Sequence, residues 1–148
     1  MKYFILLLIS FGVEATDEPF NVTMKLLAPI VITEVSPLTF PNSPRGTAVN
    51  VVVATGDAGA ATFSATGSPS TAFVKSMVTP SVTLLLGGVP SGGDLTKEIV
   101  VDTFVLAGPS AFDAAGNAVG MKVGATARVS ANDQAGNYSA VATFRIVY

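Results

Sequence analysis

The chain has 148 residues, enough for one domain with a sizeable core, of which 49% are hydrophobic and 12% charged, with no histidine and no cysteine. Without imidazole or thiol groups, the sequence offers no histidine base, no thiolate nucleophile and no ordinary zinc or haem site, so we expect no cofactor and no enzyme. The formal net charge is only −2, which gives nucleic acid or an anionic membrane surface little to attract.

Residues 1–15 have the features of a secretion signal that is removed on export. Lys2 supplies a positive charge, residues 3–13 form an apolar stretch, and Val13-Glu-Ala15 resembles a small-residue cleavage site. The alternative is a membrane anchor, but eleven residues are too few for a helix that crosses about 30 Å of hydrocarbon. We therefore expect an exported protein whose mature form begins at Thr16 and has no membrane span.

The next segment, residues 16–27, has the alternation of a β-strand. Its apolar residues are Phe20, Val22, Met24 and Leu26, with polar residues between them, and a period of two places the four side chains on one face. Ala28-Pro29 then separates the segment from the rest of the chain. The segment is either the first strand of the domain or a detachable strand that pairs with a neighbouring molecule through main-chain hydrogen bonds.

Residues 28–148 are predicted to form one β domain. Short runs of β-branched and small residues are separated by Gly, Pro, Asn and Asp, and helical periodicity is almost absent. Turn signals recur roughly every ten residues, which predicts an immunoglobulin-like β-sandwich, with a closed barrel as the alternative. The most apolar run, 98–106, is expected at the sheet centre. The strands predicted before the last one are residues 28–35, 47–55, 61–66, 72–78, 81–86, 98–106 and 119–130.

A short motif, Asp-x-Ala-Gly-Asn, occurs twice, at residues 113–117 and 133–137. One interpretation is calcium binding by clustered loop oxygens, but each motif supplies a single carboxylate and calcium prefers about six to eight oxygens. The favoured interpretation is a pair of turns in which Gly and Asn adopt a left-handed backbone conformation. The twenty-residue spacing predicts that both turns lie at the same end of the sandwich.

The last segment, residues 138–148, also alternates. Tyr138, Ala140, Ala142, Phe144, Ile146 and Tyr148 are predicted to share one face of a single long strand. A final core strand of an ordinary sandwich would show the same pattern. The alternation therefore predicts a strand with one buried face and leaves its functional role open.

Three stretches carry a resemblance to a known family. They are Leu27-Ala-Pro-Ile-Val-Ile-Thr33, Thr62-Phe-Ser-Ala-Thr-Gly67 and Ala135-Gly-Asn-Tyr-Ser-Ala-Val-Ala-Thr-Phe-Arg-Ile-Val-Tyr148. The chain resembles bacterial secreted pilin-like domains, related to chaperone–usher fimbrial subunits and spore-coat-U-type subunits. The resemblance implies an incomplete immunoglobulin-like sandwich whose missing strand is first replaced by a periplasmic chaperone and then by the N-terminal strand of the next subunit.

The resemblance also implies a role for each end of the chain. Residues 1–15 would be the signal, 16–27 the donor-strand extension and 28–148 the pilin-like domain. The donor side chains would be Phe20, Val22, Met24 and Leu26. The residues bordering the acceptor groove or facing the chaperone would be Gly136, Tyr138, Phe144, Ile146 and Tyr148, with the carboxylate of Tyr148 as an anchoring point. Unlike many subunits of the family, this chain has no cysteine for a disulfide.

The function we expect is therefore a structural subunit of an extracellular, fimbria-like filament. Its partners would be identical subunits, a periplasmic chaperone and an outer-membrane usher. The alternative is a self-contained secreted sandwich that binds a surface glycan or calcium, although the sequence has no tryptophan for a sugar platform. An enzyme would have to use carboxylates such as Glu98, Asp102, Asp113 and Asp133, whose spacing fixes no pair.

Overall fold

The computed structural model describes residues 16–148, so the predicted signal, residues 1–15, lies outside the described part. Within residues 16–148 there are nine strands and one short 3-10 helix, and no α-helix. The elements are β1 (Val31–Ser36), β2 (Val49–Val53), β3 (Ala61–Thr66), β4 (Val74–Met77), β5 (Val82–Leu86), η1 (Leu95–Lys97), β6 (Glu98–Ala107), β7 (Asn117–Val129), β8 (Tyr138–Ser139) and β9 (Phe144–Val147).

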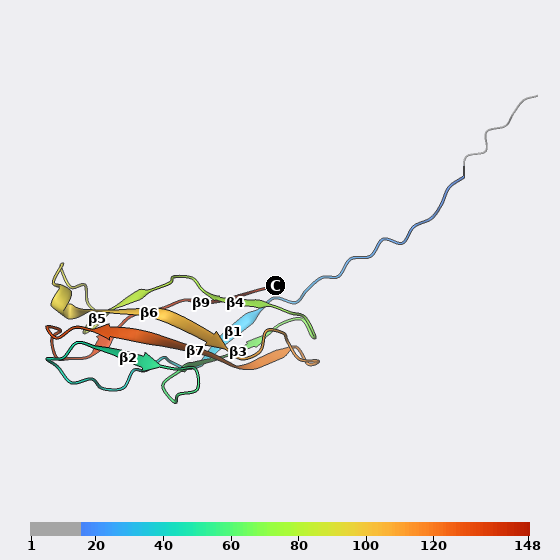
Figure 1. Cartoon of the computed structure of the whole chain (residues 1–148). Coiled ribbons are helices and arrows are strands. Elements are labelled where there is room, and N and C mark those ends of the chain that lie inside the picture. Colours follow the sequence, from blue (N-terminus) through green and yellow to red (C-terminus); the bar gives the residue numbers. More distant parts are fainter. Residues whose placement is uncertain (1–15) are drawn as a thin grey trace, which may run out of the picture.

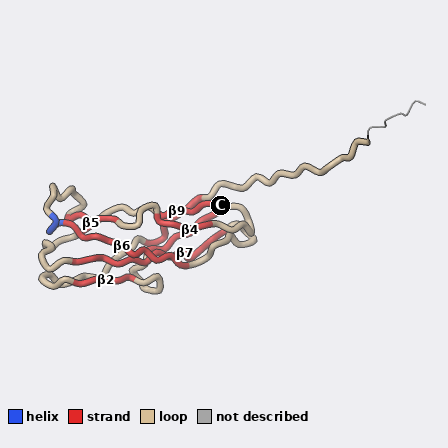
Figure 2. The backbone as a smooth tube through the Cα atoms, turned by 45° about the horizontal axis from the view of Figure 1, so that its top comes forward, coloured by secondary structure: helices blue, strands red, loops and turns tan. Residues whose placement is uncertain are grey.

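The strands form two antiparallel sheets. The larger sheet has the order β1-β3-β7-β6-β5-β8, with β2 also paired to β7, and the smaller sheet contains β4 and β9 (Figures 1 and 2). The prediction of an all-β, sandwich-like fold is confirmed. The closed-barrel alternative is wrong, because β1 and β8 end the larger sheet and do not pair with each other.

The centre of the larger sheet is β7, a strand of thirteen residues. One edge of β7 pairs with β3 along its first half and with β2 along its second half, while the other edge pairs with β6. Gly120 lies in the register shift opposite Phe63 and Ser64, with a φ of +77°. A bulge with this backbone conformation favours glycine, which has no Cβ to clash. The bulge allows one strand to serve two partners along the same edge.

The hydrophobic core is divided into two clusters that differ in how well they are covered. The first core cluster consists of Ala65, Phe73, Phe112, Ala118, Met121 and Ile146, and only three partly buried hydrophobic residues pack against it. The second core cluster consists of Ile99, Val101, Ala125 and Ala127, and eight partly buried hydrophobic residues pack against it. The residues of both clusters are buried, but the second is surrounded by the larger set of hydrophobic side chains that are only partly buried.

The predicted strand over residues 138–148 is wrong in one respect, because the segment forms two strands instead of one. β8 pairs with β5 in the larger sheet, and β9 pairs with β4 in the smaller sheet. Between them the chain passes from one sheet to the other, held by the bond from the Val78 N–H to the Thr143 carbonyl at 2.9 Å. Alternation in the sequence cannot reveal such a change of partner, because both strands keep the same period.

Both Asp-x-Ala-Gly-Asn motifs lie at turns, but at opposite ends of the molecule. Their glycines have positive φ, +84° at Gly116 and +154° at Gly136, whereas the prediction of a left-handed asparagine is wrong, since Asn117 begins β7 and Asn137 has no positive φ. The Asp113 carboxylate accepts the N–H groups of Ala115 and Asn117, at 2.9 and 2.8 Å, and the Asp133 carboxylate accepts the N–H of Ser130 at 2.7 Å. The expected placement at one end is wrong because β7 alone spans most of the interval between the motifs. A single strand carries the chain from one end of a sheet to the other.

The N-terminal residues lie outside this body. Residues 16–27, which we call the arm, have no regular secondary structure and extend away from the end of the molecule at which β9 finishes (Figures 1 and 2). Regular structure begins only at Val31, the first residue of β1. Within residues 16–148, no helix is long and apolar enough to cross a membrane.

Candidate functional site

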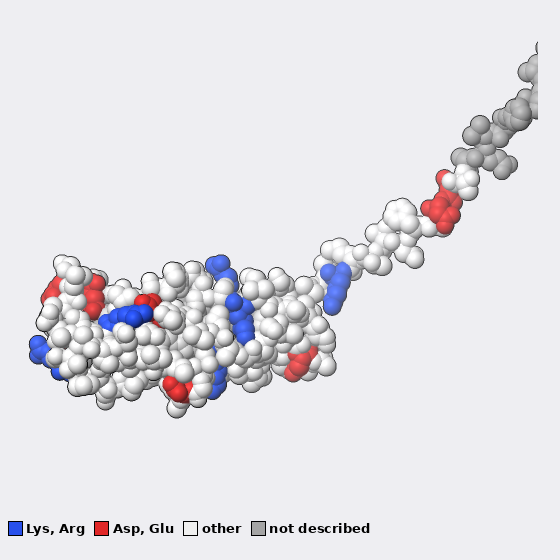
Figure 3. Space-filling view, in the orientation of Figure 1, with Lys and Arg blue, Asp and Glu red and all other residues white. Residues whose placement is uncertain are grey.

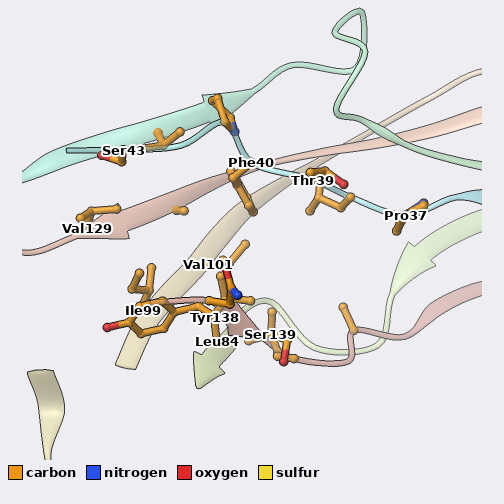
Figure 4. Close-up of a pocket in the computed structure, with 18 of the residues that line it drawn as sticks. Pro37, Thr39, Phe40, Ser43, Leu84, Ile99, Val101, Val129, Tyr138 and Ser139 are labelled. Atoms are coloured by element: carbon orange, nitrogen blue, oxygen red, sulfur yellow. The ribbon is translucent and has the colours of Figure 1, made fainter. Parts of the chain in front are cut away.

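An apolar groove of about 860 Å³ opens on the side of the sandwich where the two sheets fail to meet. Its two walls are the segment 37–45, which follows β1, and the segment 135–142, which contains β8. Its floor is formed by residues of β5, β6 and β7. Figure 4 shows Phe40 on one wall and Tyr138 on the other, with Val101 and Ile99 between them. We call this cavity the groove.

The groove is open because its two walls are not paired with each other, although β8 in one wall pairs with β5. The segment 37–45 has no strand, as its prolines Pro37, Pro41 and Pro44 predict, and it is tied to the body by the bond from the Thr39 N–H to the Gly59 carbonyl at 2.8 Å. No backbone hydrogen bond within residues 16–148 joins this segment to residues 138–142. An additional strand between the two walls would find main-chain partners there.

The apolar character of the groove comes from the second core cluster. The hydrophobic residues that pack against this cluster and remain partly exposed are Leu38, Phe40, Val51, Val82, Leu84, Phe104, Val129 and Tyr138. All eight line the groove. In a closed sandwich such residues would be covered by an opposing strand. Their incomplete burial leaves a row of apolar side chains accessible from the groove.

The end of the groove farthest from the arm is held by hydrogen bonds around Tyr138. Its hydroxyl donates to the Gln134 carbonyl at 2.8 Å and lies 3.2 Å from the Thr96 carbonyl oxygen. The Gln134 side chain in turn donates to the Thr96 hydroxyl at 3.0 Å. Burial, together with the nearby Asp133 carboxylate, raises the pKa of Tyr138. The phenol therefore stays protonated, and remains a donor, at neutral pH.

The opposite end of the groove is marked by Phe63 and Phe144. Their rings stack with centroids 4.7 Å apart and an angle of 25° between the planes. Both residues line the groove, and both also pack against the first core cluster. The pair joins β3 of the larger sheet to β9 of the smaller one. It forms the boundary between the closed and the open parts of the sandwich.

The predicted donor residues all lie on the arm and are exposed. The exposed fractions are 84% for Phe20, 81% for Val22, 84% for Met24 and 79% for Leu26. Large apolar side chains at alternate positions of an extended chain could fill a row of pockets spaced as a strand spaces them. Their exposure to water is unfavourable, and a contiguous row of exposed apolar side chains is a feature of interaction sites.

The predicted residues of the last segment fall into two groups. Gly136, Tyr138 and Phe144 line the groove. Gly136 is closely approached by the Leu86 side chain, so a Cβ would not fit there. Ile146 is 7% exposed and belongs to the first core cluster, and Tyr148 lies at the base of the arm. The structure therefore brings three of the five residues to the groove and places the other two elsewhere.

The carboxylates considered for catalysis or calcium binding have separate partners. Asp102 forms an ion pair with Arg128 at 2.9 Å, Glu98 accepts from the Ser91 hydroxyl, and Asp113 and Asp133 cap their own turns. Within the described residues, no three metal-ligating acidic side chains lie together. Figure 3 shows isolated charged side chains on a mostly uncharged face of the body.

Two parts of the site are absent from the sequence-based predictions. The first is the wall formed by residues 37–45, which lies between the predicted strands 28–35 and 47–55 and was assigned no role. The second is Ser68, which is 4% exposed and contacts both the base of the arm and Tyr148. No local pattern indicates either role, because each depends on a neighbour that is distant in sequence.

No protein-family model matches this chain, and neither a curated protein sequence nor a solved structure matches it. The functional argument therefore depends on the arm, the groove and the way they are connected. These features define an all-β, sandwich-like domain with an open groove and an exposed N-terminal segment whose apolar residues alternate.

Proposed function

We propose that this protein is a structural subunit of an extracellular filament, in which the arm of one copy fills the groove of the next. The observation that carries the proposal is that one chain holds both an open apolar groove and an exposed arm with four apolar side chains at alternate positions. Unpaired edges and apolar surface of this kind promote association unless they are covered. A second copy supplies the matching element.

Insertion of the arm of one copy into the groove of the next can be repeated without limit, so it would produce a filament. Each added copy fills one groove and brings a new unfilled groove, so the contact is head-to-tail and does not close on itself. Strand addition supplies main-chain hydrogen bonds along both walls, and the apolar side chains of the arm would cover the second core cluster. The function we propose is mechanical and requires no cofactor.

The proposal includes export and assistance before assembly. An open groove is a hazard for a free subunit, so we propose that a periplasmic chaperone occupies it until an outer-membrane usher adds the subunit to the filament. The resemblance to chaperone–usher subunits supports this route, as do the signal-like residues 1–15. The site of action is then the cell surface.

The first experiment tests the apolar face of the arm. The variant Phe20→Ser/Met24→Ser removes two large side chains, whose burial contributes about 1.5–3 kcal/mol each. Since about 1.4 kcal/mol corresponds to a tenfold change in affinity, we expect assembly to weaken by at least about a hundredfold. Sedimentation velocity and electron microscopy of the chain from Thr16 measure polymer length. The matched control, Asn21→Ser/Thr23→Ser, changes the polar face and should assemble normally. Equal assembly of both variants would contradict the proposal.

A second experiment supplies the arm as a free peptide. A peptide with the sequence of residues 16–27 should compete for the groove and shorten the filaments in proportion to its concentration. The control is a peptide of the same composition in which the order of residues destroys the alternation. Inhibition by both peptides to the same extent would indicate nonspecific apolar binding and would count against donated-strand assembly.

A further inference from the structure

The base of the arm is fastened to the body by a closed ring of hydrogen bonds. The Ala28 N–H donates to the Ser68 hydroxyl at 2.6 Å, the Ser68 N–H donates to the Tyr148 hydroxyl at 2.7 Å, and the Tyr148 hydroxyl donates to the Ala28 carbonyl at 2.6 Å. The three bonds join Ala28, Ser68 and Tyr148 in a cycle, with the Tyr148 hydroxyl both accepting and donating. We call these three residues the clasp.

The surroundings of the clasp hold the Tyr148 hydroxyl in place. Its ring packs against Phe112, with centroids 6.0 Å apart, and Phe112 is 3% exposed. Gly67 lies beside both groups, and a Cβ there would stand 2.7 Å from the Tyr148 hydroxyl and 2.5 Å from the Phe112 ring. Only glycine leaves this space. The aromatic packing and the missing side chain together orient the phenol toward Ala28.

The clasp determines the direction in which the arm leaves. Both backbone polar groups of Ala28 are engaged, so the two peptide units that meet at Ala28 are held in one orientation, and this orientation sets the direction in which the arm begins. The arm extends away from the body at this point (Figure 1). To reach its own groove it would have to fold back along the molecule toward Tyr138, which would require a reversal immediately beside the clasp.

We propose that the clasp keeps the arm out of the groove of its own chain and so presents it to a second copy. This inference rests on the proposed function and adds a positioning role for Tyr148 and Ser68. An arm that filled its own groove would leave a closed monomer with nothing to donate. Whether the arm fills its own groove or the groove of a second copy would then depend on the contacts of Ala28, which lie away from the groove and from the donor side chains.

The test measures the direction of the arm independently of assembly. The chain contains no cysteine, so Val22→Cys on the arm and Val52→Cys on the body can be labelled specifically with nitroxides. Pulsed electron–electron double resonance then gives the distribution of distances between the two nitroxides. Measurement in the Phe20→Ser/Met24→Ser background prevents any transfer of the arm between copies, and dilution with unlabelled protein leaves only distances within one chain.

The decisive variant is Tyr148→Phe, which keeps the ring against Phe112 and removes the hydroxyl. We expect the distance distribution to widen by about twofold or more, because a released arm samples many directions. Ser68→Ala, which removes the acceptor for the Ala28 N–H, should have the same effect. Tyr138→Phe is the matched control, since it removes a phenol at the far end of the groove. An unchanged distribution in both clasp variants would overturn the inference.

With the native arm sequence, Tyr148→Phe should also lower the yield of filaments at least about threefold and increase the monomer, as some arms fill their own grooves. Normal filament yield would overturn the inference. The two proposals fail differently. If wild-type protein and the Phe20→Ser/Met24→Ser variant assemble alike, the proposed function is wrong, while the distance measurement still tests the clasp.

Discussion

The stacked rings of Phe63 and Phe144, with centroids 4.7 Å apart, join the two sheets at the place where the sandwich begins to open. On one side of this pair the first core cluster is covered by both sheets. On the other side, the partly buried residues that pack against the second core cluster face the groove. The pair therefore acts as the seal at the end of the closed core.

The stacking of Phe63 on Phe144 should appear as a coupling free energy between the two residues. A double-mutant cycle with Phe63→Leu and Phe144→Leu keeps apolar volume and removes the stacking. We expect a coupling free energy of about 0.5–1.5 kcal/mol in urea unfolding, the usual range for such aromatic pairs. Additive effects of the two substitutions would show that the rings contribute only through the area they bury.

The close approach of Tyr148 and Phe112 to Gly67 predicts a large effect of a single methyl group. Gly67→Ala should destabilise the fold by about 1–3 kcal/mol, because the new Cβ would overlap the Phe112 ring. The control is Gly56→Ala, where no atom lies within 4 Å of the added Cβ. Urea midpoints of the two variants compare a crowded with an open site. Similar midpoints would contradict this account of the packing.

The ion pair between Asp102 and Arg128 predicts a dependence of stability on pH. The hydrogen bond that Arg128 donates to Asp102 lowers the pKa of Asp102 in the folded protein, and the hydrogen bond from Thr103 lowers it by a smaller amount. Because the folded pKa is lowered, the stabilisation is present above the unfolded pKa, about 3.9, and is lost as pH falls through the folded pKa.

Asp102→Asn should therefore lower the urea midpoint slightly at pH 7. The difference from wild type should diminish as the pH falls below about 4, where Asp102 becomes protonated. The contribution is modest because both side chains are largely in solvent, and about 1 M salt should reduce it further. A difference that stays constant from neutral to acid pH would show that the charge on Asp102 is not its source.

The proposed insertion of the arm predicts a specific cross-link between copies. One preparation carries Met24→Cys and the other Leu84→Cys, so that a disulfide between the two different variants joins the arm of one chain to the groove of another; peptide mass spectrometry distinguishes it from disulfides between two copies of one variant. Leu84 lines the groove and is partly buried. Val52→Cys is the control, because Val52 is 60% exposed on a strand whose neighbouring residues face inward. Equal cross-linking to both positions would indicate random collisions.

Much of the fold could be predicted because strands have strong local signals. β3 begins and ends at the predicted residues, and the other internal strands were predicted within two or three residues. Alternation, prolines and turn residues act over a few positions, so they are visible in the sequence. The split of the last segment into β8 and β9 was missed, because pairing partners are chosen by the whole fold and leave the period unchanged.

The candidate site was less predictable for the same reason. The arm is visible in the sequence because its alternation stops at Ala28-Pro29. The groove is visible only in three dimensions, since its walls come from segments almost a hundred residues apart. The family resemblance implied a place for Tyr148 at the border of the groove, but its hydroxyl bonds to Ala28 at the base of the arm. The alternation gives the side of a strand and carries no information about what faces it.

The two core clusters differ in how many partly buried side chains surround them, so we expect the free energy of local unfolding to vary along the molecule. Amide hydrogens in the half that contains Met121, which is fully buried, can exchange only when both sheets separate. Amides of β5 and β8 lie beside the groove, where few contacts must break before water enters. Protection against exchange should therefore fall steadily from the end that holds the arm toward the end that holds Tyr138. We therefore expect slow amide exchange at the end of the body from which the arm leaves, and faster exchange at the end that holds Tyr138.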